Sequence, residues 1–534
     1  MRYRLTLDTG PGRTMKTYLL KAFAAFSIVF AAAAPAHAEW REAKSENFTV
    51  IGDMPEGELR EWSHRLEQYH GMLQYLLDAK RTVPVTVYVL DGLGAVQQAG
   101  GSRSIAGFYS ATAQSANAVV PERLNFDRGI EDFNPRIILL HEYAHHMLLT
   151  NVEMFMPGWA QEGLAEMFAT AKVEDDGSVV IGDKNDSRAD AMFGMSRWSV
   201  RRMLDSDFNP PSNRDENIEK YSRGWALAHY LWMSGERPNQ YGEFIAELNR
   251  TVDPVASGEK VFGDLGRLDR ELDRYIRAHK FKLARFGPDL IGTPGEITIR
   301  TLREGEAAMI DYRLTSTIGV TEETAGPLVQ RARPIAARYP DDVTVQTWLA
   351  EMEYDAKNYD LSWAAAERAL AIDPENMFAM VYKGRVLMRR AIAAGDRDLA
   401  REARDWFLKA NRADPNHALP LQTFYDSFAP MGDTPTDGAV NGLYAATIMV
   451  PQDTSLRVRS AVELLRDGNL AQARAILAPA AFQPEGIGEN KPLKLIREME
   501  TTQDTAALLA KAAELKLDKI NEFIDPPEED DSES

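Results

Sequence analysis

The spacing of hydrophobic and polar residues predicts a mixture of strands and helices in the first part of the chain. Short runs of β-branched and aromatic residues predict strands at 48–51 and 83–90, with two shorter apolar pieces at 108–109 and 116–120. Apolar side chains at helical spacing predict helices at 55–79, 135–150 and 216–234, and a further helix beginning near Pro157. Residues 173–183 predict a strand pair around the turn Asp176-Gly177. We therefore expect an α+β domain over residues 39–290.

The pattern changes in the second part of the chain. Residues 291–320 alternate over short stretches without a long helical run, so we expect a short β connector there. From about residue 322 the pattern is helical, and a proline-containing turn recurs at Pro340, Pro374, Pro415 and Pro451. The spacing is close to the roughly 34-residue period of tetratricopeptide repeats, and residues 363–391 resemble one such repeat. We therefore expect an all-α repeat domain over 321–520 and an acidic, disordered tail over 521–534.

Repeats of this kind stack into a superhelix with a concave binding face. We therefore expect the repeat domain to bind a partner protein or a peptide. The alternative is a helical array that only buttresses the first domain.

The N-terminal residues 1–38 resemble a secretory signal peptide. Lys16 and Lys21 lie just before an apolar run from Ala22 to Ala34. Ala36-His37-Ala38 provides a small-x-small cleavage site. We expect cleavage after Ala38, with Met15 as a possible true start, and a periplasmic or secreted protein that keeps no stable membrane anchor. The alternative is a buried helix or a membrane anchor, although the apolar run is short for a membrane span.

Composition narrows the classes of function. The chain has 534 residues, a net charge of −19 and no cysteine. The negative charge argues against nucleic acid as a partner. The absence of cysteine excludes disulfides, thiol catalysis and cysteine-ligated zinc.

One stretch carries a recognisable chemistry. His141, Glu142 and His145 form an H-E-x-x-H pattern inside the apolar helical segment 137–150, for which Asn134 is a candidate N-cap. Residues i and i+4 share one helix face, so both imidazoles can reach one metal ion. Glu142 would lie beside that ion, where it can act as a general base on water. The alternative is a pair of core histidines with satisfied hydrogen bonds.

A second acidic pattern follows on the helix that begins near Pro157. A helical hairpin would bring Glu162 to the same ion, and two His with one Glu leave zinc the open position of a catalytic site. Glu166 lies one turn later on the same face, where it can accept a hydrogen bond from a ligand imidazole.

The segment HEYAH followed by GWAQEGLAEMF resembles the gluzincin metallopeptidases, and residues 39–290 are similar to bacterial peptidase-MA proteins, which often combine such a domain with helical repeats. This resemblance implies one zinc ion bound by His141, His145 and Glu162, with Glu142 as general base and Glu166 behind the ligands. The chain lacks the G-x-M-E-N exopeptidase motif, which favours an endopeptidase.

The same resemblance implies two further features of the site. An edge strand should lie over the zinc and pair with the substrate backbone, for which residues 114–121 are the candidate. A Tyr, or a Tyr and a His, should stabilise the oxyanion, and Tyr221 and His229 are the candidates. The alternatives are a core aromatic residue and a structural histidine, and His146 is expected to be structural.

These observations predict an α+β gluzincin-like domain followed by an all-α tetratricopeptide-like domain. The function they predict is zinc-dependent hydrolysis of a peptide or protein substrate. Two alternatives remain open. One is a repeat-based binding protein with an inactive or structural gluzincin-like domain, and the other is a zinc hydrolase that acts on a non-peptide substrate.

Overall fold

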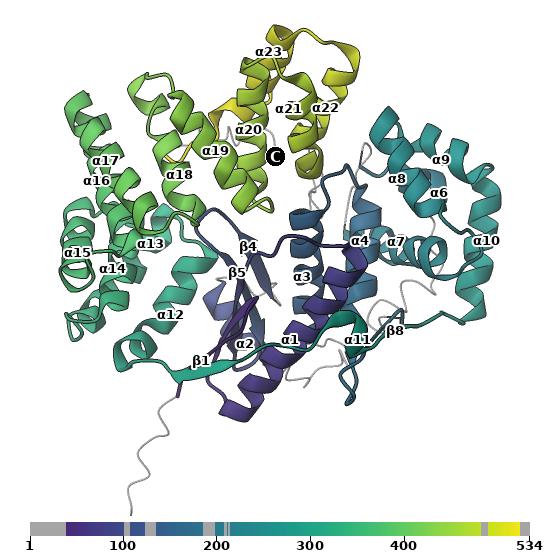
Figure 1. Ribbon diagram of the computed structural model, residues 1–534, viewed down its shortest axis with the longest axis horizontal. Helices are drawn as coiled ribbons and strands as arrows, with labels where there is room; N and C mark the ends of the chain where they lie inside the picture. The colour runs from purple at the N-terminus through teal and green to yellow at the C-terminus, as the bar shows by residue number, and fades with distance from the viewer. Residues whose placement is uncertain are drawn as a thin grey trace, which may run out of the picture. The chain divides into compact units, whose positions relative to one another are not determined.

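The computed structural model describes residues 39–100, 107–122, 135–184, 198–207, 211, 214–481 and 490–523 (Figure 1). The expected signal segment 1–38, the candidate N-cap Asn134 and most of the acidic tail lie outside these ranges, so the expectations about them stay predictions. Among the described helices, none combines the length and the apolar character needed to cross a membrane.

A mixed sheet organises the N-terminal part of the chain. Its strands are β1 (Arg41–Lys44), β2 (Phe48–Gly52), β3 (Val85–Leu90), β4 (Phe108–Ala111), β5 (Ala116–Pro121) and β9 (Thr298–Thr301). They lie in the order β4-β5-β3-β2-β1-β9. The neighbours β2–β3 and β3–β5 are parallel, and the remaining pairs are antiparallel. The predicted strands of this region are therefore confirmed, and β1 and β9 extend the sheet.

The prediction that residues 114–121 form an edge strand of the sheet is wrong. Strand β5 pairs with β3 on one side and with β4 on the other, and all six of its residues are buried. Its nearly continuous apolar run fits this interior position, because a strand covered on both faces needs no alternation. Among the described strands, β4 forms this edge of the sheet.

Two helices pack against the sheet and against each other. Helix α1 (Glu56–Leu77) and helix α3 (Pro135–Asn151) contribute to the same core as the sheet, and α2 (Gly92–Ala99) packs beside β5. The buried Tyr69 of α1 donates a hydrogen bond to the carbonyl of Leu140 at 2.9 Å. Phe48 of β2 packs on Tyr143 of α3, with ring centroids 4.8 Å apart. These contacts fix α3 on the sheet.

A second group of elements follows α3. Helix α4 (Gly158–Ala169) is succeeded by a three-stranded sheet of β6 (Lys172–Val173), β7 (Val179–Ile181) and β8 (Ala284–Phe286). The predicted turn between β6 and β7 is confirmed, with Gly177 at φ +80°. The helices of this group are α6 (Val200–Leu204), α7 (Arg214–Met233), α8 (Gln240–Thr251), α9 (Pro254–Phe262) and α10 (Leu265–Ala278).

The predicted β connector at 291–320 is only partly correct. It follows the short helix α11 (Pro288–Ile291) and contains β9, but it also contains the 15-residue helix α12 (Glu304–Ile318). This helix is short of strong apolar residues, and its buried Met309, Ile310 and Leu314 form a narrow stripe. Ile310 and Leu314 pack beside Tyr88 of the sheet and Leu302, whereas Met309 packs in the core of the following helices, and these tertiary contacts stabilise a helix with a weak local signal.

Helices make up the rest of the described chain. They are α13 (Glu322–Ala336), α14 (Val343–Asp355), α15 (Tyr359–Ile372), α16 (Met377–Ala394), α17 (Arg397–Ala413), α18 (Ala418–Asp426), α19 (Asp437–Met449), α20 (Thr454–Arg466), α21 (Leu470–Leu477), α22 (Lys491–Thr501) and α23 (Thr505–Glu514), with short 3₁₀ turns at Ala429–Met431, Ala478–Ala481 and Leu517–Lys519. The expected order, an N-terminal region with a mixed sheet followed by a helix-rich region, is therefore present.

The hydrophobic cores do not follow the predicted domain boundary. One continuous core contains residues of β2, α1, α3 and α4 together with residues of α20, α22 and α23. Arg457 of α20 donates a hydrogen bond to the carbonyl of Leu149 at 3.1 Å. The end of the helical region therefore packs on α3, as Figure 1 shows for α20 and α3.

Candidate metal centre

The H-E-x-x-H residues lie in the middle of α3, where the apolar residues of the helix face the core. His145 is buried and His141 is half-buried, and both rings point toward one place. Their Nε2 atoms are 3.1 Å apart. A spacing of one helical turn accounts for this convergence, because residues i and i+4 lie on the same face.

Helix α4 supplies the third member of the group. Glu162 Oε2 lies 3.3 Å from His141 Nε2 and 3.5 Å from His145 Nε2. All twelve residues of α4 are buried, so Glu162 stands on a helix that is packed on every side. Helix α7 approaches α4 closely, since a Cβ atom at Gly163 would lie 2.5 Å from the carbonyl oxygen of Gly224. The position of Glu162 is therefore set by packing on both sides.

The geometry of this triad fits a metal ion. In a tetrahedral site with zinc–ligand bonds of roughly 2.0–2.1 Å, neighbouring ligand atoms are about 3.3 Å apart. The three separations in the triad lie close to that value. The two carboxylate oxygens of Glu162 are buried, and apart from the two imidazoles no group of the described residues donates a hydrogen bond to them, which is costly without a cation nearby. His141, His145 and Glu162 could therefore hold a metal ion.

The charged groups around the triad also favour the binding of a cation. Burial lowers the pKa of His141, but hydrogen bonding to Glu162 and the charges of Glu166, Glu162 and Glu142 outweigh burial and raise it to about 9. Burial raises the pKa of Glu162, but His145 and His141 outweigh burial and lower it to about 2. The carboxylates therefore stabilise a positive charge on the imidazole of His141, which is a proton when no metal is bound. A metal ion that binds to the triad would displace this proton.

Two other glutamates lie around the triad. Glu166 is buried one turn after Glu162, and its Oε1 lies 4.0 Å from Nδ1 of His141, the nitrogen that faces away from Glu162. This distance exceeds a direct hydrogen bond, but the carboxylate is on the side of the ring where a supporting group is expected. Glu142 is half-buried, and its charge acts on both His141 and Tyr109.

Tyr109 is a residue that the sequence analysis did not single out. It lies on β4, and its hydroxyl hydrogen-bonds with Nδ1 of His146 at 2.5 Å. His146 Nε2 in turn bonds to the carbonyl of Val83 at 2.9 Å, so both ring nitrogens of His146 are used. Burial lowers the pKa of His146 to about 4, which keeps the ring neutral. The structure thus places His146 outside the triad, as expected, and ties α3 to β4. The sequence offers one signal for Tyr109, which is its position in the short apolar piece 108–109 ahead of the helix that carries the H-E-x-x-H pattern.

The two candidates for oxyanion stabilisation have different surroundings. Tyr221 is half-buried on α7, one turn before Gly224 and therefore close to the contact between α7 and α4. His229 is fully buried on the same helix. Its Nδ1 bonds to the Tyr275 hydroxyl at 2.8 Å, and its Nε2 bonds to the carbonyl of Gly182 at 3.0 Å. Because both of its nitrogens are engaged in these contacts, the structure favours a structural role for His229, and its role as an oxyanion donor stays a prediction.

Comparison with known proteins locates a related segment without naming a function. Residues 138–255 match a family described as "Protein of unknown function (DUF1570)". The matched segment contains the complete triad, Glu142 and Glu166. No curated protein matches the sequence.

Proposed function

We propose that this protein is a gluzincin-like zinc peptidase, and that it acts as an endopeptidase on peptide or protein substrates. His141, His145 and Glu162 would bind zinc, and Glu142 would be the general base. The observation that carries the proposal is the triangle of Nε2, Nε2 and Oε2 atoms, with sides of 3.1, 3.3 and 3.5 Å. Two imidazoles and one carboxylate are a common donor set of catalytic zinc sites.

Each side chain has a separate role in this proposal. When bound, zinc would polarise the scissile carbonyl and lower the pKa of a water molecule. Glu142 would take a proton from the attacking water and deliver it to the leaving amine. Glu166 would orient the imidazole of His141 from behind. Tyr221 remains the candidate donor to the oxyanion, because His229 is engaged elsewhere.

Strand β4 supports an extended peptide as the substrate. Among the described strands it pairs on one side only, with β5, and its Tyr109 reaches α3 through His146. An open strand edge can bind an extended backbone by adding it as a further strand, which requires no free peptide terminus. We propose that β4 has this role instead of residues 114–121. Export to the periplasm or beyond, after cleavage following Ala38, is part of the same proposal.

Metal content tests the proposal first. The mature chain 39–534 should contain one zinc per chain by inductively coupled plasma mass spectrometry, and Glu162→Gln and His141→Ala should each lose it. Glu142→Gln should keep the zinc, because this side chain is not part of the triad. Metal-free wild-type protein after purification with added zinc would overturn the proposal.

Hydrolysis tests the role of Glu142. A protease screen with unstructured protein substrates should detect cleavage by the zinc-loaded wild type. Glu142→Gln should reduce the rate by about 10²–10⁴-fold, since this is the usual contribution of a general base. Cleavage that persists in this variant would show that the activity belongs to a contaminant or to another site.

The engagement of His229 favours a second candidate function. Loss of one expected oxyanion donor is what a binding protein with a structural metal site would show. Such a protein would hold zinc but would cleave no peptide, and the wild type and Glu142→Gln would then behave alike. A non-peptide zinc hydrolase would instead cleave small esters or amides and leave proteins intact.

A further inference from the structure

The last described residues of the chain, which follow the 3₁₀ turn Leu517–Lys519, lie against the helical region. Phe523 is buried, with 3% of its surface exposed. It belongs to an apolar cluster with Leu387 and Met388 of α16 and Phe407 of α17. The rings of Phe407 and Phe523 are 6.3 Å apart. Phe523 is therefore an aromatic anchor that fills a pocket formed by two helices.

Arginines of α16 hold the backbone and the acidic side chain of this segment. Arg389 donates hydrogen bonds to the carbonyls of Glu522 and Phe523 at 3.1 and 3.2 Å. Arg385 is buried and forms an ion pair with the Glu522 carboxylate at 2.5 Å. Arg385 also lies 5.1 Å from the centre of the Tyr382 ring. The segment is thus recognised through its main chain, one carboxylate and one aromatic ring.

A third helix completes the contact. Asn521 donates a hydrogen bond to the carbonyl of Asp426, at the end of α18, at 3.0 Å. The amide of Phe523 in turn donates to the Asn521 side chain at 2.9 Å, which fixes the local turn of the segment. Residues 521–523 therefore contact α16, α17 and α18 through a set of contacts typical of a bound peptide.

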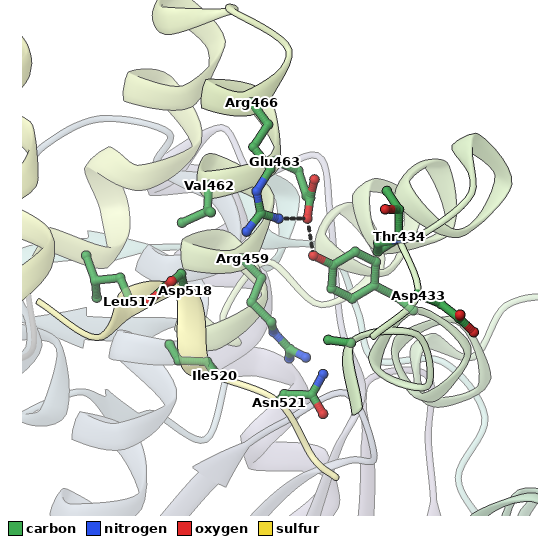
Figure 2. Close-up of a pocket in the computed structure, with 13 residues that line it drawn as sticks. Asp433, Thr434, Arg459, Val462, Glu463, Arg466, Leu517, Asp518, Ile520 and Asn521 are labelled. Atoms are coloured by element: carbon green, nitrogen blue, oxygen red, sulfur yellow. Dashed lines mark hydrogen bonds and ion pairs between the residues drawn. The ribbon is translucent and has the colours of Figure 1, made fainter. Parts of the chain in front are cut away.

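Cavities border this segment on both sides. One, of about 330 Å³, lies between Leu517–Asn521 and residues of α20, including Arg459, Glu463 and Arg466. Figure 2 shows Arg459 beside Ile520 and Asn521, Glu463 and Arg466 above them, and Asp433 and Thr434 on the opposite side of this space. The other, of about 430 Å³, is lined by Glu522, Arg385 and Asp355 and by Gln114 from the turn between β4 and β5. The segment is held at Phe523 but is not embedded along its length.

We propose that these contacts form a peptide-binding groove on α16, α17 and α18, and that residues 520–523 are an internal ligand occupying it. The partner would be a protein segment that forms a local turn and carries an acidic residue directly before a phenylalanine. Its carboxylate would replace that of Glu522 at Arg385, its ring would replace that of Phe523, and Arg389 would bind its carbonyls. The C-terminal segment would then compete with the partner. This proposal does not depend on zinc or on peptidase activity.

A labelled copy of the internal ligand tests the groove directly. The probe is a fluorescein-labelled peptide of residues 520–534, and the protein is the chain 39–519, compared with the full mature chain. The shortened chain should bind the probe in fluorescence anisotropy. The full chain should bind it at least about tenfold more weakly, because the tethered segment competes at high effective concentration. A peptide with Phe523→Ala should also bind at least about tenfold more weakly to the shortened chain, because it loses the anchor.

Matched variants distinguish specific recognition of the peptide from nonspecific binding. In the shortened chain, Arg389→Ala should weaken binding, whereas Arg390→Ala should not, because Arg390 pairs with Asp360 instead. Circular dichroism checks that each chain is folded. If the shortened chain unfolds, the full-length variant Phe523→Ala decides, and it should bind the wild-type probe more tightly than the wild-type chain does. Equal binding by these two full-length chains, or by a folded shortened chain to the Phe523→Ala peptide, would overturn the proposal.

Discussion

The Glu166 carboxylate faces the ring nitrogen of His141 that is not directed at the triad. A negative charge at this place raises the basicity of the imidazole and fixes its orientation. We expect Glu166→Gln to keep one zinc per chain at saturation but to weaken zinc affinity by about 10–100-fold. Competition with a chromogenic chelator measures the change.

Glu174→Gln is the matched control for this prediction. Glu174 is exposed on the turn between β6 and β7, after α4, and does not belong to the metal cluster. Unchanged affinity in Glu166→Gln would assign Glu166 a role in packing only.

Single residues show where local sequence reasoning works and where it fails. The convergence of His141 and His145 was predictable, because it depends only on the geometry of one helix. To predict that Glu162 lies beside the two histidines required one further assumption, a tight hairpin between the two helices. Tyr109 and His229 were not predictable in this way. Their hydrogen-bond partners, His146 and Gly182 among them, are brought to them by tertiary packing.

At the scale of elements, the close approach of α4 and α7 positions Glu162. A Cβ atom at Gly163 would meet the carbonyl of Gly224 at 2.5 Å and the Cβ of Ala228 at 2.9 Å, so the helices would have to separate. We expect Gly163→Ala to lower the free energy of unfolding by about 1–3 kcal/mol. It should also weaken zinc binding, because Glu162 would move with α4. Urea denaturation and chelator competition measure the two effects.

Gly242→Ala is the control, since a Cβ atom at this helical position has no neighbour within 4 Å. It should leave stability unchanged or raise it slightly, because alanine favours helix more than glycine does. A Gly163→Ala chain as stable as Gly242→Ala would show that the two helices separate at no cost.

His229 links α7 to β7 and α10 in its neutral form. Burial lowers the pKa of His229 below its usual value. Below about pH 6.5 the unfolded chain therefore binds a proton at this position that the folded chain does not bind. The free energy of unfolding should fall as the pH decreases, with a contribution from His229 of at most about 1.4 kcal/mol per pH unit.

The variant His229→Gln removes this titration and keeps a donor and an acceptor in the side chain. Denaturation curves of the metal-free proteins between pH 7 and 5 should show a shallower decline for His229→Gln than for the wild type. His64→Gln, at an exposed position of α1, is the matched control. Parallel declines for the wild type and His229→Gln would contradict the prediction.

Up to residue 290, the elements that carry and surround the triad were predictable from their strong apolar patterns, whereas the helices α2, α6, α8, α9 and α10 were not predicted. Residues 116–120 showed that a strand was present but not that β3 and β4 lie on both sides of it. Strand order depends on contacts between distant segments, which a local pattern does not contain. The same reason accounts for α12, which is stabilised by the contacts of Ile310 and Leu314 with the distant residue Tyr88 and with Leu302.

At the scale of the molecule, the helical region and the metal-site region share one core. Leu465 of α20 and Leu495 of α22 are buried in the same cluster as Met147 of α3. Division of the chain at residue 290 would therefore separate side chains that pack in one core, and it would also remove β9 from its pairing with β1. The sequence analysis placed a domain boundary there, because a repeat pattern does not reveal that the last helices return to the first domain.

This arrangement predicts the behaviour of a fragment. The chain 39–290 should lack a cooperative thermal transition and should expose apolar surface to the dye ANS, whereas 39–534 should unfold cooperatively. Circular dichroism melts and dye fluorescence measure both properties. A fragment that melts cooperatively, and holds zinc, would show that the shared core is dispensable for the site.

The pairing of β1 with β9 has a consequence for the time course of biosynthesis. The hydrogen bond from Thr298 to the carbonyl of Lys44 joins residues 254 positions apart. At about 5–20 residues per second, the ribosome needs on the order of 10–50 s to deliver β9 after β1 has been made. During this interval the nascent chain carries an unpaired strand edge, which is a template for aggregation. The triad residues are all translated before β9, so the candidate metal centre is expected to be synthesised while the sheet still lacks its last strand.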